Sequence, residues 1–216
     1  MSETKQKDLI IVGHSGFGKE VFWLASRLGL QVRGFLDDNP EVADLTFADT
    51  PVIGGVKNWV DHHDCQFVIA IGNPRIRQKV CATMQALGTP HFATLIDPAA
   101  VVMAGHVNIG EGSVICAGTV CTVEVNIGRH VIINLNCSIG HECAFGDFVT
   151  VAPLAAVSGN VSLGEKSEVG TAASIRQGLT IGKGAMVGMG SVVTKNVSEN
   201  TVVFGAPAKA IKTLED

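Results

Sequence analysis

The sequence predicts an α/β N-terminal part, with a small parallel sheet that resembles half of a Rossmann fold, followed by a left-handed parallel β-helix of hexapeptide repeats. Two observations predict it. Strands and helices alternate in the first hundred residues, and apolar side chains then recur at every sixth position from Met103 to Val193. We expect one domain at residues 1–98 and a second at residues 99–216.

The six-residue period is the stronger observation. It fits neither an α-helix, with 3.6 residues per turn, nor a strand, with a side-chain period of two. It is typical of a hexapeptide β-solenoid. A β-sandwich, which is the alternative, has no reason to keep one six-residue phase for so long. The apolar positions after Met103 are Ile109, Ile115, Cys121, Ile127, Ile133, Ile139, Phe145, Val151, Val157, Leu163, Val169, Ile175, Ile181, Val187 and Val193.

Each hexapeptide should form a short strand and a tight turn, and three successive hexapeptides should form one triangular coil. The residue two places before each apolar position is small or β-branched, apart from Leu179, so we expect both side chains to point inward. Burial of each aliphatic side chain contributes about 1.5–3 kcal/mol, but only when the coils stack on one another. A glycine often follows the apolar residue, as at Gly128 and Gly146, and we expect it to adopt a positive φ there.

Composition excludes several classes of protein. The content of 46% hydrophobic and 17% charged residues, with 25 Gly, suits a close-packed solenoid, and a net charge of −4 argues against a nucleic-acid binder. The first eight residues are polar and no apolar run is long enough to span a bilayer, so we expect a cytoplasmic protein without membrane insertion. The six Cys residues lack CxxC spacing, and Cys121, Cys137 and Cys143 fall on inward positions, so no metal site is expected.

The N-terminal region follows a β-α-β order. We expect strands at residues 8–13, 32–36 and 66–71, and helices at residues 19–28 and about 75–87. This order indicates a small parallel sheet with helices on its faces. Ligands of such sheets bind at the carboxyl ends of the strands.

Candidate ligand-binding residues follow each of the three strands. The Gly-rich turn after the first strand would let backbone N–H groups approach a diphosphate at a helix start, and Asp37 could accept hydrogen bonds from sugar hydroxyls. Alternatively, the glycines serve only a tight turn. The glycine spacing departs from the dinucleotide fingerprint, and the second half of a dinucleotide domain is missing, so NAD is not expected. The candidates are Gly13, His14, Ser15, Gly16, Phe17, Gly18, Asp37, Asp38, Asn73 and Arg75.

One turn of the solenoid carries reactive groups. His141 comes two residues after the inward Ile139, so its side chain should project outward, and Glu142 follows it. Gly159 comes three hexapeptides after His141, which is one full coil, and should stack beside it. An imidazole, a carboxylate that holds it and a backbone N–H are the components of an acyl-transfer site.

Together these features resemble a known family. The residues that carry the resemblance are Phe35-Leu36-Asp37-Asp38, Ile71-Gly72-Asn73, the hexapeptide coils, His141-Glu142 and Gly205-Ala-Pro-Ala-Lys209. They resemble the bacterial sugar acetyltransferases of the sialic-acid O-acetyltransferase type, and are most similar to the nucleotide-sugar N-acetyltransferases among them. The resemblance implies a homotrimer with active sites between subunits, acetyl-CoA as donor and a nucleotide-linked amino sugar as acceptor.

The resemblance also implies roles for single residues. His141 matches the active-site histidine, Glu142 the acidic residue after it, Asn134 a polar residue near the reacting groups, and Gly159 the glycine whose N–H binds the thioester oxygen. Asp37 and Asp38 match an acidic pair that contacts the nucleotide sugar. The residues implied to contact CoA are Thr150, Gly170, Thr171, Ala172, Gly188, Met189, Gly190, Pro207 and Lys209.

Two positions depart from the family pattern and affect the substrate more than the reaction. Phe17 stands where relatives commonly have His, and Thr150 where they can have a second His. The Phe17 change and the stretch from Asn134 to Glu142 look like GDP-perosamine N-acetyltransferases. This implies acetylation of the 4-amino group of a nucleotide-linked 4-amino-4,6-dideoxy sugar, such as GDP-perosamine, for surface-polysaccharide synthesis.

Alternatives remain open at this point. The residues themselves do not distinguish guanine from uracil or thymine. An O-acetyltransferase acting on a sialic-acid-like sugar would share the same solenoid. A third alternative is a non-catalytic or carbonic-anhydrase-like solenoid, but the latter needs zinc held by several histidines, and His141 has no histidine at the stacking distance of one coil.

Overall fold

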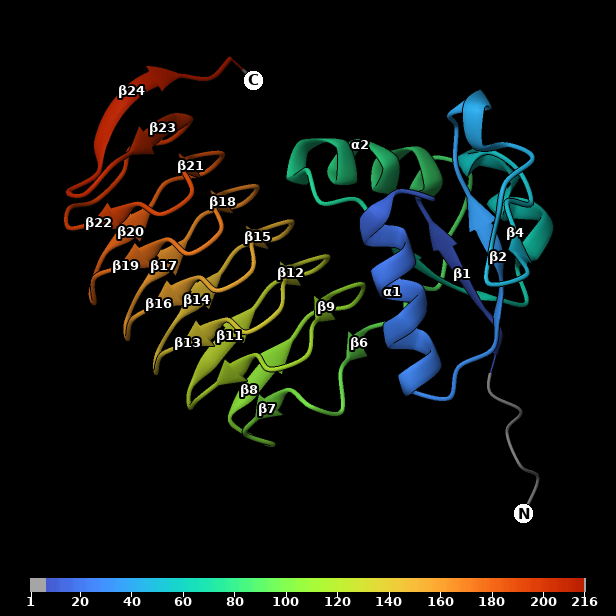
Figure 1. Cartoon of the computed structure of the whole chain (residues 1–216), viewed down its shortest axis with the longest axis horizontal. Coiled ribbons are helices and arrows are strands. Elements are labelled where there is room, and N and C mark those ends of the chain that lie inside the picture. Colours follow the sequence, from blue (N-terminus) through green and yellow to red (C-terminus); the bar gives the residue numbers. More distant parts are fainter. Residues whose placement is uncertain (1–6, 216) are drawn as a thin grey trace. The chain divides into compact units, whose positions relative to one another are not determined.

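The computed structural model describes residues 7–215. The chain divides into two compact units between Leu95 and Ile96, whereas the sequence suggested a boundary after residue 98. The two units, coloured blue to teal and green to red in Figure 1, are described separately.

The N-terminal unit is built on a parallel three-stranded sheet with the order β2-β1-β5. All four residues of the central strand are buried, as expected for a parallel strand covered on both faces. Helix α1 packs on β1 and β2, and helix α2 packs on β5. The bounds are β1 (Leu9–Val12), α1 (Gly16–Arg27), β2 (Val32–Leu36), β5 (Gln66–Ile69) and α2 (Pro74–Gln85).

The predicted β-α-β arrangement is therefore confirmed, although α1 begins at Gly16 rather than Lys19, because the helix starts inside the Gly-rich turn. The remaining elements of this unit connect β2 to β5, and the sequence did not predict them. They are η1 (Pro40–Val42), the antiparallel pair β3 (Thr46–Phe47) and β4 (Thr50–Pro51), and the 3₁₀ helix η2 (Val56–His62).

The C-terminal unit is a parallel β-solenoid, which confirms the predicted hexapeptide repeat (Figure 1). Its strands form three sheets, with the orders β22-β19-β16-β13-β10-β7, β20-β17-β14-β11-β8 and β24-β23-β21-β18-β15-β12-β9-β6. The register is the predicted one of three hexapeptides per coil: Cys121 pairs with Ile139, Ile139 with Val157, and Val157 with Ile175.

The strands of the solenoid are short, and nearly all contain two residues. Their bounds are β6 (Leu95–Ile96), β7 (Val101–Val102), β8 (Val107–Ile109), β9 (Val114–Ile115), β10 (Val120–Cys121), β11 (Val125–Ile127), β12 (Ile132–Ile133), β13 (Ser138–Ile139), β14 (Ala144–Phe145), β15 (Thr150–Val151), β16 (Ala156–Val157), β17 (Ser162–Leu163), β18 (Glu168–Val169), β19 (Ser174–Ile175), β20 (Thr180–Ile181), β21 (Met186–Val187), β22 (Val192–Val193), β23 (Thr201–Phe204) and β24 (Lys209–Thr213).

The core of the solenoid consists of the predicted inward residues. Every sixth residue from Ile115 to Val193 is buried, as are most of the small residues two places earlier. Cys121, Cys137 and Cys143 are free, buried thiols in this core. Burial raises the pKa of Cys121 to about 12 and that of Cys137 to about 11, so both thiols are neutral at physiological pH.

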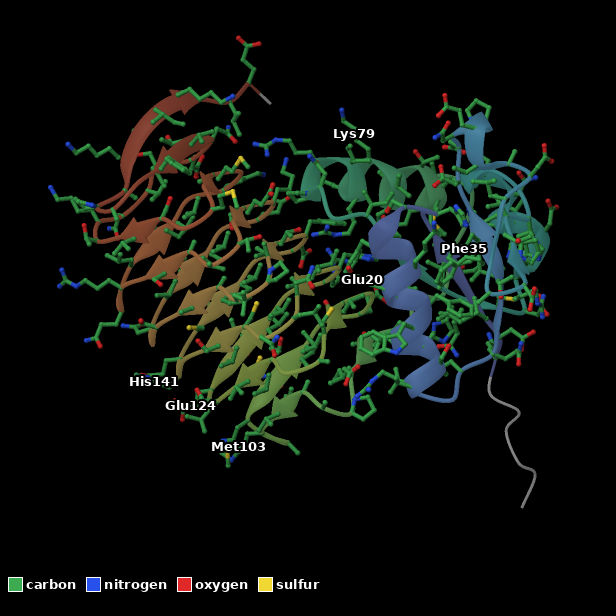
Figure 2. The ribbon with its side chains drawn as sticks, in the orientation of Figure 1. Glu20, Phe35, Lys79, Met103, Glu124 and His141 are labelled. Atoms are coloured by element: carbon green, nitrogen blue, oxygen red, sulfur yellow. The ribbon has the colours of Figure 1, made fainter. Side chains whose placement is uncertain are left out.

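The predicted period holds through Val193, which is buried and pairs with Ile175, but not at its first position. Met103, expected as the first inward residue, projects from the edge of the solenoid in Figure 2. It is 47% exposed, and Val102 pairs with Cys121 in its place. Since the step from Val102 to Cys121 is longer than the regular step from Cys121 to Ile139, the first coil has one extra residue, which turns Met103 outward. Beyond the predicted stretch, Val187 pairs with Val203, two residues short of a full coil, and β23 and β24 form an antiparallel hairpin.

The prediction that glycine follows the inward residues because it adopts a positive φ there was wrong. The glycines that follow the inward residues, such as Gly128 and Gly146, do not have positive φ; the left-handed residue of each turn comes two positions later, as at Glu142 (φ 59°). Glycine is required because stacked turns approach closely. A Cβ at Gly146 would lie 2.6 Å from the backbone nitrogen of Glu165 in the next coil.

Candidate active site

The solenoid has three corners, and most of the candidate residues occupy two of them. The turns after β9, β12, β15, β18 and β21 form the first corner, and those after β10, β13, β16 and β19 form the second. The first corner contains residues 116–118, 134–136, 152–154, 170–172 and 188–190. The second contains residues 122–124, 140–142, 158–160 and 176–178.

An imidazole–carboxylate pair projects from the second corner. The side chain of His141 is 59% exposed, and Figure 2 shows it at the outer edge of the solenoid. Its Nδ1 lies 2.8 Å from Oε2 of Glu142. Because an ionised carboxylate can only accept a hydrogen bond, Nδ1 carries the proton in this contact. In the neutral ring, Nε2 is therefore the nitrogen with a free lone pair.

Gly159 lies against this ring, as the spacing of one coil predicted. A Cβ at this position would stand 2.5 Å from Cε1 and 2.8 Å from Cδ2 of His141, so only glycine leaves space for the imidazole. Within residues 7–215, no acceptor is found for the Gly159 N–H. The second corner thus brings together a basic nitrogen, a carboxylate and a free backbone donor.

The first corner gathers the other solenoid candidates. Asn134 stands there, so within one chain it is not beside His141, from which β13 and its sheet separate it. The amide oxygen of Asn134 accepts a hydrogen bond from the Leu135 N–H (2.8 Å). Thr150, on β15, is only 7% exposed. The remaining candidates of this corner are Gly170, Thr171, Ala172, Gly188, Met189 and Gly190.

The first corner is also apolar on its surface. Met189 is 65% exposed and Leu154, one coil from Ala172, is 58% exposed. The ring of Phe204, which is 51% exposed, covers Gly188 where a Cβ would otherwise stand. Sequence reasoning missed Leu154 and Phe204. The regular coil spacing could have indicated Leu154, but Phe204 lies on the hairpin that the period does not reach.

A hollow of about 390 Å³ lies at the C-terminal end of the solenoid. Pro207 and Lys209, both candidates from the sequence, line it. Lys195, which the sequence did not indicate, lines it as well, together with the polar residues Thr194 and Asn196. The hollow therefore combines two lysines with a lining that is partly polar and partly apolar.

In the N-terminal unit, the acidic pair has structural contacts. Asp37 accepts hydrogen bonds from the backbone N–H groups of His14 (2.7 Å) and Asn39 (2.9 Å), and so ties the Gly-rich turn to the end of β2. Asp38 accepts from the Val56 N–H (2.7 Å) at the start of η2. Both carboxylates line a hollow of about 270 Å³. Their remaining lone pairs can accept hydrogen bonds from a ligand.

The residues of the Gly-rich turn differ from one another in burial. Gly18 fits closely against the carbonyl of Gly13, which supports the alternative that glycine serves the turn itself. His14 is buried with its ring edge-to-face on Phe35, and burial, assisted by the charge of Lys19 and opposed by Asp37, lowers its pKa. Gly16 and Ser15 are exposed and Phe17 is half-buried.

The loop after β5 is organised by helix capping. The side-chain oxygen of Asn73 accepts hydrogen bonds from the N–H groups of Arg75 (3.0 Å) and Ile76 (3.1 Å), so Asn73 caps α2. This role differs from the ligand contact expected from the sequence. Ser15, by contrast, stands at the N-cap of α1 without a side-chain cap, and no acidic residue occupies the first turn of that helix. An uncapped helix start favours anions.

Metal-binding clusters and membrane-spanning helices are both missing from the described part of the chain. Within residues 7–215, no group of three or more His, Cys, Asp or Glu side chains is placed to hold a metal ion. No helix among the same residues is long and apolar enough to cross a bilayer.

The hexapeptide solenoid, with its outward imidazole–carboxylate pair, fits the class of hexapeptide-repeat acyltransferases. Residues 8–84 match the family model of the PglD N-terminal domain. GDP-perosamine N-acetyltransferase of Escherichia coli O157:H7 is 37% identical over 95 residues, which are 44% of this chain and 42% of that protein. The chain thus matches less than half the length of this curated relative.

Solved structures match over nearly their full length. The acetyltransferase domain of PglB from Neisseria gonorrhoeae FA1090, in complex with acetyl coenzyme A, is 33% identical with a TM-score of 0.88, over 95% of this chain and 100% of that one. A variant of perosamine N-acetyltransferase from Caulobacter crescentus, in complex with CoA and GDP-perosamine, is 29% identical with a TM-score of 0.88, over 95% and 97%. The chain belongs to the hexapeptide-repeat sugar N-acetyltransferases.

Proposed function

We propose that this protein transfers the acetyl group of acetyl-CoA to the 4-amino group of a nucleotide-linked 4-amino-4,6-dideoxy sugar, with GDP-perosamine as the first candidate. The observation that carries the proposal is the His141–Glu142 pair beside the free N–H of Gly159. Relatives that bind acetyl coenzyme A, or CoA with GDP-perosamine, support the choice of donor and acceptor.

An alkyl ammonium resembles Lys, whose pKa is about 10.4, so the acceptor first releases one proton to solvent. The amine nitrogen loses a second proton as the amide forms, and this one needs a base in the site. The neutral amine attacks the thioester carbonyl carbon, and Nε2 of His141 takes the proton that the nitrogen loses. Glu142 stabilises the resulting imidazolium through Nδ1. The Gly159 N–H stabilises the oxyanion, which collapses and expels the thiolate of CoA; His141 then returns the proton to that sulfur. General-base assistance of this kind is worth roughly 10²–10⁴ in rate.

The first corner is proposed to bind CoA. Its exposed apolar residues Leu154 and Met189 would pack against the pantetheine arm, and Thr171 and Ala172 lie in the same row of turns. The hollow at the C-terminal end would receive the phosphates, because Lys195 and Lys209 both line it. Thr150 remains a candidate contact near the thioester.

Association into a homotrimer would complete the site. His141 and the first corner are separated within one chain, so we place the second corner of one subunit against the first corner of its neighbour, with Asn134 reaching the reacting groups. The sheet between these corners exposes the paired valines Val101 and Val120 on its neighbouring strands β7 and β10, and Val192 separately on β22, and burial of these side chains would favour contact with another subunit. Sedimentation should show a trimeric mass; a monomer would contradict the shared site.

The carboxyl edge of the small sheet is proposed to bind the nucleotide sugar. The start of α1 lacks a side-chain cap and offers its N–H groups to a diphosphate. Asp37 and Asp38 would accept hydrogen bonds from hydroxyls in the hollow that they line. Phe17, half-buried, would stack on the sugar or base.

Release of the CoA thiol measures the activity directly. The acceptors to compare are GDP-, UDP- and dTDP-linked 4-amino-4,6-dideoxy sugars and a sialic-acid-like hydroxy sugar. We expect transfer to an amino sugar, fastest with the GDP-linked one, and a loss of roughly 10²–10⁴ in kcat for His141→Ala. Transfer to the hydroxy sugar alone would establish O-acetylation instead. If His141→Ala kept kcat within a few-fold, positioning rather than base catalysis would explain the rate.

A further inference from the structure

Arg77 is a buried cation in the N-terminal unit that neither the sequence prediction nor the proposed reaction uses. It lies on α2 and is 1% exposed. Removal of a guanidinium from water is costly unless its donors are satisfied. Nη1 of Arg77 donates hydrogen bonds to the carbonyl oxygens of Ile71 (2.6 Å) and Gly72 (3.0 Å). The side chain therefore folds back from α2 onto the loop that leads into this helix.

This loop lies at the edge of the sheet where the nucleotide sugar is placed. It connects the carboxyl end of β5 to Asn73, the cap of α2. It also lies against the Gly-rich turn, since a Cβ at Gly13 would stand 3.1 Å from the Ala70 oxygen and 3.2 Å from Cγ1 of Ile71. Gly72 and Asn73 themselves are exposed. By holding two successive carbonyls of the loop, Arg77 fixes a surface that faces solvent and borders the turn.

Packing alone does not account for an arginine here. A methionine of similar length could fill the same space without the cost of burying a charge. The guanidinium adds two things that methionine cannot: a donor for two adjacent carbonyls, and a positive charge near the N-terminus of α2, whose helix dipole has the same sign there. Both effects favour an anion at this edge.

We propose that Arg77 is a positioning residue for the diphosphate of the nucleotide sugar. It holds the 71–73 loop in the conformation that receives the diphosphate. The inference rests on the proposed function, because it assigns the nucleotide to this edge of the sheet. It predicts that loss of Arg77 weakens nucleotide binding and leaves acetyl-CoA binding unchanged.

Arg33 provides a matched control in the same unit. Its guanidinium binds Asp8 (2.9 Å) and Asp64 (2.7 Å), which precede β1 and β5 and so lie at the opposite, amino-terminal edge of the sheet. Arg33→Met and Arg77→Met both remove the hydrogen bonds of an arginine, and we expect both to lower Tm. Only Arg77→Met should act on the nucleotide site.

The experiment measures the full-length wild type, Arg77→Met, Arg77→Lys and Arg33→Met. Calorimetry gives Kd for GDP, UDP and dTDP, initial rates give KM for both substrates, and hydrogen exchange reports on residues 71–76. For Arg77→Met we expect Kd for the preferred nucleotide and KM for the amino sugar to rise about tenfold or more, because the loop would then occupy its binding conformation less often. KM for acetyl-CoA should stay within twofold, and exchange at residues 71–76 should quicken. Arg77→Lys keeps the charge and should show a smaller increase in Kd and in KM for the amino sugar. This variant can still be tested if Arg77→Met does not fold.

The outcomes separate this inference from the proposed function. Equal effects of Arg77→Met and Arg33→Met on nucleotide Kd, or unchanged Kd in both Arg77 variants, would overturn the role of Arg77. Failure of the wild type to bind any of the three nucleotides would overturn it as well. If the wild type binds a nucleotide diphosphate but transfers no acetyl group, the proposed function fails, whereas a selective change in Kd still supports the positioning role.

Discussion

The contact between Gly159 and His141 allows a sharp prediction for Gly159→Ala. The added Cβ would stand 2.5 Å from Cε1 of the imidazole, whereas ordinary van der Waals contact begins at 3.4 Å. The ring must therefore move by about 1 Å, and a displacement of that size can cost roughly 10²-fold in rate. Because His141 is 59% exposed, the ring can swing into solvent without disturbing the core. We expect kcat to fall about 100-fold while Tm changes little.

A double-mutant cycle distinguishes this effect from other roles of Gly159. In His141→Ala the ring is absent, so adding Gly159→Ala should cost little more, and the two losses should be strongly non-additive. The assay is acetyl transfer at saturating substrates for the wild type, both single variants and the double variant, with thermal unfolding alongside. Additive losses would refute the reasoning, because the alanine would then act independently of the imidazole.

Four further predictions concern stability and reactivity. Since burial raises the pKa of Cys121 to about 12 and of Cys137 to about 11, neither should react with iodoacetamide at pH 8 until the solenoid unfolds. Below pH 9 both states hold these protons, but from pH 9 towards 12 the unfolded state loses them first, so denaturant unfolding should show stability falling over that range. Gly146→Ala should destabilise the solenoid by about 1–3 kcal/mol, because its Cβ would stand 2.6 Å from the Glu165 nitrogen, whereas Gly72→Ala, with no atom within 4 Å, should have an effect within about 0.5 kcal/mol. Because burial lowers the pKa of His14, the unfolded chain binds a proton at this imidazole before the folded protein does as the pH falls. Stability lost between pH 7.5 and pH 5 should therefore be partly restored in His14→Gln. An unchanged pH dependence of the variant would contradict the burial argument.

The solenoid could be predicted from the sequence because every hexapeptide repeats the same pattern of apolar and small residues. The inward positions, the outward direction of His141 and the position of Gly159 all follow from one period, and the structure has them in place. The prediction failed at Met103, because the first coil has one extra residue, and the coil beyond Val193 is two residues shorter than the regular one. The addition or loss of a residue in a single coil cannot be recognised from the repeat in the sequence, so only the strand pairing in the structure shows it.

The N-terminal unit was less predictable because its polar residues serve two purposes. Asp37, Asp38 and Asn73 were identified from their places after strands, yet each also binds backbone N–H groups of a neighbouring turn or helix. Arg77 gave no signal, since an arginine inside a helix usually faces solvent, and its burial depends on carbonyls in the preceding loop. Corner residues such as Leu154 belong to the period, but their exposure becomes meaningful only when the three corners are assigned to sheets.

The antiparallel hairpin of β23 and β24 has a consequence for assembly. A parallel solenoid presents at its end a row of unpaired backbone groups, on which another coil or another molecule could stack. In the eight-stranded sheet that row is occupied by β24, which runs in the opposite direction and carries the exposed residues Lys209 and Lys212. Direction and charge together disfavour the addition of a further parallel strand there. On this sheet the hairpin therefore acts as a stop against end-to-end growth, and leaves the side faces for contacts between subunits.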